Sequence, residues 1–136
     1  MICPILCVKD IPLSIAFYEK LGFQQQMTMT GPDDMLAFAF VSLGKEATIG
    51  LSRSSDVPTT PHIDFMIYVP EGEQLDTYYS RAKARGIGIA DELRTQYWGD
   101  LTFTVIDPNG YRIVMSQRAH ETDLGGAATA ARASAR

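Results

Sequence analysis

Few side chains in this sequence can take part in acid-base or metal chemistry, because it contains only 2 histidines and 2 cysteines. His62 and Asp64 alternate with apolar residues, so they would share one face of a β-strand. An imidazole near a carboxylate can act as a general base, which makes His62 the candidate catalytic residue. The two side chains would be about 6–7 Å apart along the strand, which is long for joint binding of one metal ion.

The two cysteines form a second pair of reactive groups. Cys3 and Cys7 are four residues apart in an apolar segment that we expect to be extended, which separates them by about 13 Å. They cannot form a disulfide with each other. The simplest interpretation is that both are small buried side chains, although Cys3 could also line a cleft.

The elements that must position these residues follow from the hydrophobic pattern of the first half. An apolar strand is expected over 2–8, followed by a helix that begins after the N-cap Asp10 and ends at Gly22. Turn-forming sequences then separate three extended segments, at 23–30, 35–43 and 47–52. The first half, 1–52, therefore predicts a βαβββ module.

The same order recurs after a polar linker over 53–61. A strand is expected over 62–69, and a helix that carries Leu75 and ends at Arg85–Gly86 follows. Further strands are expected over 87–97, 101–106 and 111–117. The sequence thus predicts an α+β fold of two βαβββ modules, the second over 62–117, with a flexible C-terminal tail over 118–136.

Composition excludes several classes of function. The net charge is −4 and no long basic cluster is present, which argues against a nucleic-acid partner and an anionic membrane surface. No apolar run reaches the roughly 20 residues that cross a bilayer, and the N-terminus lacks the basic and apolar regions of a secretory signal. We therefore expect a cytoplasmic protein.

Three stretches of the sequence resemble the vicinal oxygen chelate superfamily, which contains glyoxalase I, bleomycin-resistance proteins and extradiol dioxygenases. The segment from Val8 to Phe23 is similar to the opening motif of that family, V-x-D-x-x-x-S-x-x-F-Y-x-x-x-L-G-F. The segment from His62 to Ile67 looks like its fifth strand. Trp98–Gly99, followed by Asp107 to Tyr111, resembles its closing W-G and D-P-x-G motifs.

This resemblance implies a cleft between paired modules, in which the enzymes of the family hold a divalent metal with His and Glu side chains from four strands. The corresponding positions here are Cys3, Gly50, His62 and Val114. Gly50 and Val114 have no donor atom, and a catalytic metal site normally needs three protein ligands. We therefore expect no metal and no other cofactor.

The alternation of side chains predicts which residues line the cleft. If His62 points into it, Asp64 and Tyr68 do so as well, and the aligned strands add further residues. Aromatic rings could sandwich a planar ligand, or Phe38 and Phe40 could instead be core residues with Trp98 anchoring a loop. The expected ligand-binding residues are Cys3, Phe38, Phe40, His62, Asp64, Tyr68, Trp98 and Arg112.

Two functions follow from these expectations. The first is a metal-independent small-molecule-binding protein that resembles bleomycin-resistance proteins and sequesters an aromatic, cationic or neutral ligand in the cleft of a homodimer. Dimerisation is what the resemblance implies. The alternative is a lyase, isomerase or dioxygenase with an atypical or absent metal site that uses His62. An interaction module without a ligand would leave the polar cleft unexplained.

Overall fold

A computed structural model describes residues 2–57 and 63–119 and shows the βαβββ order twice. The predicted α+β fold is therefore confirmed. The elements are β1 (Ile5–Val8), α1 (Ile11–Leu21), β2 (Gln24–Thr30), β3 (Leu36–Leu43), β4 (Ala47–Arg53), β5 (Asp64–Tyr68), α2 (Leu75–Ala84), β6 (Ile89–Thr95), β7 (Leu101–Ile106) and β8 (Arg112–Gln117).

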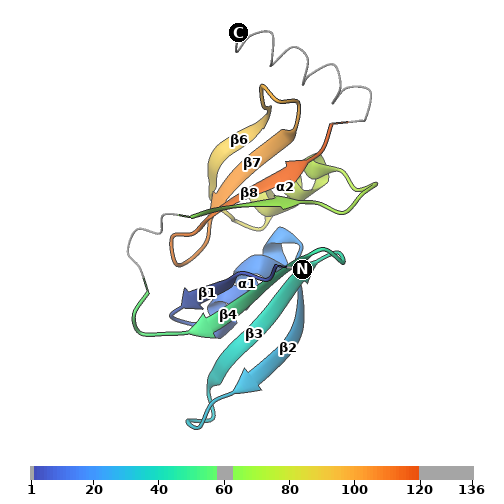
Figure 1. Cartoon of the computed structure of the whole chain (residues 1–136). Helices are drawn as coiled ribbons and strands as arrows, with labels where there is room; N and C mark the ends of the chain where they lie inside the picture. The colour runs from blue at the N-terminus through green and yellow to red at the C-terminus, as the bar shows by residue number, and fades with distance from the viewer. Residues whose placement is uncertain (1, 58–62, 120–136) are drawn as a thin grey trace.

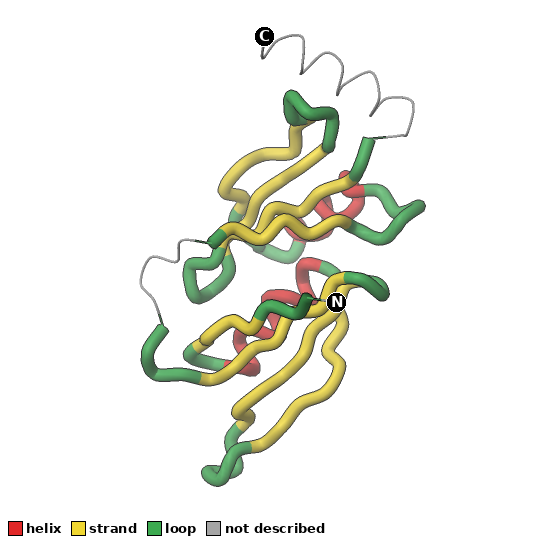
Figure 2. Tube along the Cα trace, in the orientation of Figure 1, coloured by secondary structure: helices red, strands yellow, loops and turns green. Residues whose placement is uncertain are grey.

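Each module forms its own four-stranded sheet. The strand orders are β1-β4-β3-β2 and β5-β8-β7-β6, with β1 parallel to β4, β5 parallel to β8 and the remaining pairs antiparallel. Both helices lie behind the sheets in Figure 1, and the tube in Figure 2 shows the same layering. One face of each sheet is therefore covered by a helix, and the other is left open.

The ends of α1 follow the predicted capping pattern. The Asp10 carboxylate accepts a hydrogen bond of 3.0 Å from the backbone N–H of Leu13, and Pro12 occupies the first turn, where its missing N–H costs nothing. Gly22 ends the helix with a φ of 112°, a left-handed conformation that favours glycine. Its N–H also donates to the Glu19 carbonyl, so the chain turns directly into β2.

The start of α2 is capped from a distant strand. Its N-cap residue, Gln74, makes no side-chain capping hydrogen bond. The Gln117 side-chain oxygen, at the end of β8, accepts a 2.7 Å hydrogen bond from the N–H of Leu75 instead. This contact satisfies one of the free N–H groups at the helix start and fixes α2 against its own sheet.

Several strand boundaries differ from those expected. β1 begins at Ile5 because the pairing with β4 starts there, opposite Gly50, although the Pro4 carbonyl also accepts from the Gly50 N–H. β5 begins at Asp64, β6 is shorter at both ends, and β4 continues through Arg53. Residues 58–61 of the predicted linker, position 62 of the predicted strand and residues 120–136 of the predicted tail lie outside the described residues. The division into 1–52 and 62–117 stays a prediction.

The hydrophobic core is one cluster built from both modules. It includes Ile11, Tyr18 and Leu21 of α1, together with Leu75 of α2 and Phe103 of β7, all almost fully buried. The ring of Tyr78 lies so close to Gly22 that a side-chain carbon there would come within 2.6 Å of it. The two helices therefore pack closely at this point, and the modules share one interior.

A buried polar contact joins the modules beside this core. The Tyr18 hydroxyl donates a 2.8 Å hydrogen bond to Asp107, whose other oxygen accepts from the N–H groups of Asn109 and Tyr111. Burial raises the pKa of the Asp107 carboxyl, although these hydrogen bonds oppose the shift. Burial, with the nearby Asp107 charge, also holds the pKa of Tyr18 well above its usual range. Tyr18 is therefore a hydrogen-bond donor at neutral pH.

Candidate functional site

The open face of the first sheet is mainly apolar. We call it the apolar face and define it by residues that the strand register places side by side: Ile5, Cys7, Met29, Phe38, Phe40, Gly50 and Ser52. None of these residues is charged. Ile5 is 59% exposed and Met29 is 54% exposed, so much apolar surface on this face is accessible to water.

Gly50 lies beneath a cover of apolar side chains on this face. A side-chain carbon at this position would come within 2.9 Å of the Phe38 ring and 3.1 Å of Ile5, with Phe40 at 3.5 Å. The Phe38 and Phe40 rings meet edge to face, with their centroids 4.9 Å apart. Both rings are half-buried and lie on the open side, away from α1, so they do not belong to the core beneath the helix.

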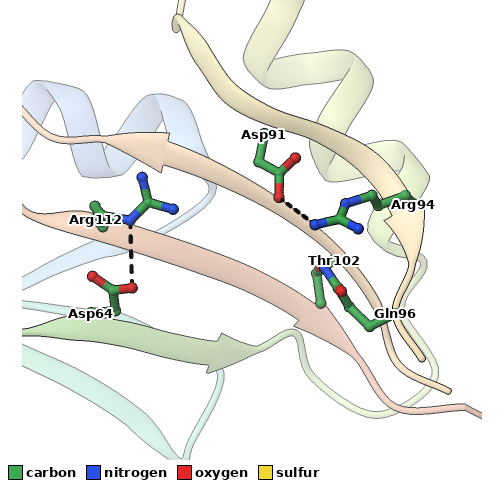
Figure 3. A network of polar contacts seen from close by, with 6 residues as sticks. All are labelled: Asp64, Asp91, Arg94, Gln96, Thr102 and Arg112. Atoms are coloured by element: carbon green, nitrogen blue, oxygen red, sulfur yellow. Dashed lines mark hydrogen bonds and ion pairs between the residues drawn. The ribbon is translucent and has the colours of Figure 1, made fainter. Parts of the chain in front are cut away.

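The open face of the second sheet carries charged and polar side chains, and we call it the charged face. Figure 3 shows six of its residues, Asp64, Asp91, Arg94, Gln96, Thr102 and Arg112. Arg112 pairs with Asp64 at 3.4 Å, and Arg94 pairs with Asp91 at 3.1 Å. Both pairs are partly exposed, so each contributes little to stability. Asp64 and Asp91 therefore each have an arginine partner on this face.

At one end of the charged face, a buried carboxylate holds two aromatic side chains. Asp100 is only 3% exposed, and its Oδ2 accepts hydrogen bonds from the Tyr68 hydroxyl at 2.7 Å and from the Trp98 indole N–H at 3.0 Å. The Arg118 guanidinium carbon lies 4.2 Å from the centre of the Tyr68 ring, on its face. We call these four residues the aromatic corner.

Hydrogen bonds to Asp100 preorganise the two rings of the aromatic corner. Each aromatic ring is fixed by a hydrogen bond to a charged acceptor, which is stronger than a bond between neutral groups. Burial and the hydrogen bond to Asp100 raise the pKa of Tyr68, while the Arg118 charge opposes this shift. The phenol therefore stays protonated at neutral pH and continues to donate to Asp100.

Two of the four positions that the resemblance assigns to metal ligands, Gly50 and Val114, carry no metal-binding side chain. Gly50 has no donor, and the space above it is filled by Phe38 and Ile5. Val114 is opposite Met66 in the register and likewise has no donor. Within residues 2–57 and 63–119, no group of three His, Cys, Asp or Glu side chains is arranged to hold a metal. Gly50 and Val114 therefore supply none of the three side-chain ligands that a catalytic metal site normally needs.

The structure brings together some of the predicted ligand-binding residues and separates others. Phe38 and Phe40 share the apolar face, Asp64 and Arg112 form an ion pair, and Tyr68 and Trp98 converge on Asp100. Cys3 is half-buried just before β1, and His62 lies outside the described residues. The predicted sandwich of Trp98 with Phe38 or Phe40 would need rings from two different modules, because Trp98 lies in the turn between β6 and β7 and the two phenylalanines lie on β3.

Sequence reasoning did not identify Asp100 or Arg118 as site residues. Asp100 follows Trp98–Gly99 directly, and a carboxylate close to the only tryptophan was the available signal. Arg118 was assigned to the tail, and nothing in the spacing connects it with Tyr68 across 50 positions.

A hollow of about 270 Å³ lies between the two modules, since residues of both line it. Pro4 and Thr48 line it from the first module, and Met66 and Tyr68 line it from β5. Pockets that bury a drug-sized ligand are about 300–1,000 Å³. The volume of this hollow is close to the lower end of that range, and residues of β4 and β5 both line it.

Residues 3–115 match the family model described as Glyoxalase/Bleomycin resistance protein/Dioxygenase superfamily. No curated protein matches the sequence. Among the described residues, no helix is long and apolar enough to span a membrane.

Solved structures with a similar fold have low sequence identity to this chain. TioX from Micromonospora sp. ML1 is 16% identical, with a TM-score of 0.69 over 88% of this chain and 97% of that one. A bleomycin-binding protein complexed with bleomycin is 19% identical, with a TM-score of 0.68 over 87% and 98%. A glyoxalase/bleomycin resistance protein/dioxygenase from Alicyclobacillus acidocaldarius is 19% identical, with a TM-score of 0.67 over 91% and 95%.

Proposed function

The chain belongs to the glyoxalase/bleomycin resistance protein/dioxygenase superfamily, and on this basis we propose that it binds a small aromatic molecule without a metal ion. Its ligand is cationic or neutral, and the expected result of binding is sequestration, not conversion. The observation that carries this proposal is the apolar cover over Gly50, where the Phe38 ring and Ile5 occupy the space that a metal ligand would need.

The two open faces offer complementary contributions to such a ligand. The apolar face provides ring surface, at about 25 cal/mol for each Å² of apolar area removed from water. The charged face provides ion pairs and the aromatic corner, which can orient the polar groups of a ligand. A planar molecule with a polar end would match the two faces together.

Enclosing this ligand calls for more protein surface than one chain presents. The hollow between the modules has a volume of about 270 Å³ and is open to solvent, so one chain leaves part of a drug-sized ligand exposed. A homodimer that places the apolar face of one protomer opposite the charged face of its partner would bury more of it. We therefore propose that the binding unit is a dimer, and its expected location is the cytoplasm.

A thermal-shift screen of protein treated with EDTA tests this proposal against a panel of planar aromatic antibiotics that includes bleomycin. A bound compound raises the melting temperature by mass action. We expect such a rise without added metal, and we expect Phe38→Ala and Trp98→Ala to lose it. The control variant Leu13→Ala, which changes an exposed side chain on α1, should keep it. Sedimentation should show a dimer. Binding that depends on added Ni²⁺, Zn²⁺, Fe²⁺ or Mn²⁺, or by a monomer, would contradict the proposal.

The enzyme alternative makes a different prediction. If His62 acts as a general base, His62→Ala should lower turnover of a converted compound by about 10²-fold or more. For a binding protein we expect no turnover of any panel compound that binds, and only a modest change in its affinity in the same variant. Mass spectrometry of each compound after incubation distinguishes the two outcomes.

A further inference from the structure

The positive charge of Arg118, a side chain of the protein itself, already occupies the aromatic corner. The Arg118 guanidinium carbon lies 4.2 Å from the centre of the Tyr68 ring, within the range of a cation–π contact. Arg118 is an exposed residue just beyond the end of β8. Among the described residues it forms no ion pair with a carboxylate, so the Tyr68 ring is the contact that positions its charge.

Tyr68 is well suited to hold a cation at this place. Its hydroxyl donates to the Asp100 carboxylate at 2.7 Å, and this bond to an anion increases the electron density of the phenol. The ring face attracts positive charge through its quadrupole. Asp100 also adds a negative charge beside the Tyr68 hydroxyl, and no arginine or lysine of the described chain neutralises it through an ion pair within 4.0 Å.

The contact between Arg118 and Tyr68 is weak enough to be exchanged. Cation–π contacts at exposed sites are weak, and Arg118 must give up side-chain freedom to make this one. A ligand cation of the same planar shape can therefore take its place, leaving Arg118 free in water. The Trp98 indole N–H donates to the same Asp100 oxygen as the Tyr68 hydroxyl. Its NMR resonance therefore reports on the exchange of one cation for another at the Tyr68 ring.

We propose that the Tyr68 ring face is a subsite for a planar cation of the guanidinium or amidinium class, which Arg118 occupies until a ligand displaces it. This inference rests on the proposed small-molecule function and specifies the charged end of the ligand. Asp100 is then a positioning residue, because it orients Tyr68 and Trp98 through hydrogen bonds without touching the ligand.

Benzamidinium is the probe, and its neutral analogue benzamide is the control of the same shape. The protein contains a single tryptophan, so ¹⁵N-labelled protein gives one indole N–H resonance in the NMR spectrum. We expect benzamidinium to shift this resonance in a saturable way and benzamide to shift it much less. Arg118→Ala removes the internal competitor and should tighten benzamidinium binding by about two- to fivefold, the worth of one exposed cation–π contact.

Matched variants keep the result specific. Arg81→Ala removes the same charge from the exposed side of α2 and should leave the affinity unchanged. Tyr68→Leu should abolish the response, and Tyr68→Phe, which retains the ring and the fold, should weaken it. Unchanged or weaker benzamidinium binding in Arg118→Ala would overturn the proposal. Benzoate binding that disappears in the same variant would overturn it too, because Arg118 would then be an anion site.

The experiment separates this inference from the proposed function. If an aromatic antibiotic stabilises the protein but benzamidinium does not move the indole resonance, the cation subsite is wrong and the binding function stands. If benzamidinium binds as expected but no antibiotic of the panel does, the subsite stands and the proposed sequestration of a planar aromatic antibiotic is wrong.

Discussion

Tyr18 and Asp107 are 89 residues apart in the chain, yet the hydroxyl of the first donates a 2.8 Å hydrogen bond to the carboxylate of the second. Tyr18 belongs to α1 in the first module, and Asp107 follows β7 in the second. Both side chains are buried, so this bond ties together two segments that form separate sheets.

Removing the Tyr18 hydroxyl should therefore destabilise the whole protein. Tyr18→Phe leaves a buried carboxylate with one donor fewer, which typically costs about 1–3 kcal/mol. Urea unfolding followed by circular dichroism measures this loss. Tyr97→Phe removes a hydroxyl from a side chain that is 79% exposed and should change the free energy of unfolding by less than about 0.5 kcal/mol. Equal stability of the two variants would contradict the structural role of Tyr18.

The Asp107 carboxyl should make stability depend on pH in a defined direction. Its pKa is raised above the ordinary value of 3.8, chiefly by burial, so the folded state binds the proton more tightly than the unfolded state does. The stabilisation from this proton is fully present below pH 3.8 and is lost as the pH rises through the raised pKa.

Comparison with Asp107→Asn isolates this effect from the other acidic groups. We expect the free energy of unfolding of the natural protein, relative to that of the variant, to fall as the pH is raised from about 3.8 towards neutral. Urea titrations at several pH values measure the difference. A difference that increases with pH would show that the hydrogen bonds from Tyr18, Asn109 and Tyr111 outweigh burial.

The apolar cover over Gly50 predicts a local packing response. Gly50→Ala places a carbon 2.9 Å from the tip of the Phe38 ring, so the ring must move or the protein loses about 1–3 kcal/mol by overpacking. Adding Phe38→Leu removes that ring atom and should restore part of the loss. Urea unfolding of the single and double variants measures this coupling.

Gly88 provides the matched control for this pair. A side-chain carbon at Gly88 meets nothing within 4 Å, and its backbone conformation does not require glycine. Gly88→Ala should therefore be neutral or slightly stabilising, since it restricts the unfolded chain. If Gly50→Ala behaves in the same way, the Phe38 ring does not restrict the space above Gly50.

The predictable part of this protein lies in short-range patterns. The helix that starts after Asp10 and ends at Gly22 follows from capping chemistry within one segment, and the structure confirms it. The shared face of Phe38 and Phe40 follows from the two-residue period of a strand. The second module could be predicted in the same way, because its elements repeat the first order.

The unpredicted part depends on contacts between distant segments. Gln117 caps α2 from β8, and Arg118 meets Tyr68, although no local pattern links either pair. The start of β5 at Asp64, rather than at position 62, is likewise set by pairing with Arg112 across the sheet. Trp98 and Phe38 belong to different halves of the chain, and no short-range pattern relates positions so far apart.

The shared interior of the two modules has a consequence for how the protein loses its structure. Neither half can open without exposing apolar side chains from both, since the core is one cluster and Tyr18 reaches Asp107 through its edge. A repeated architecture would suggest two successive denaturation steps, but this packing leads to a single cooperative one. A destabilising substitution in the core, far from either open face, therefore unfolds both faces together.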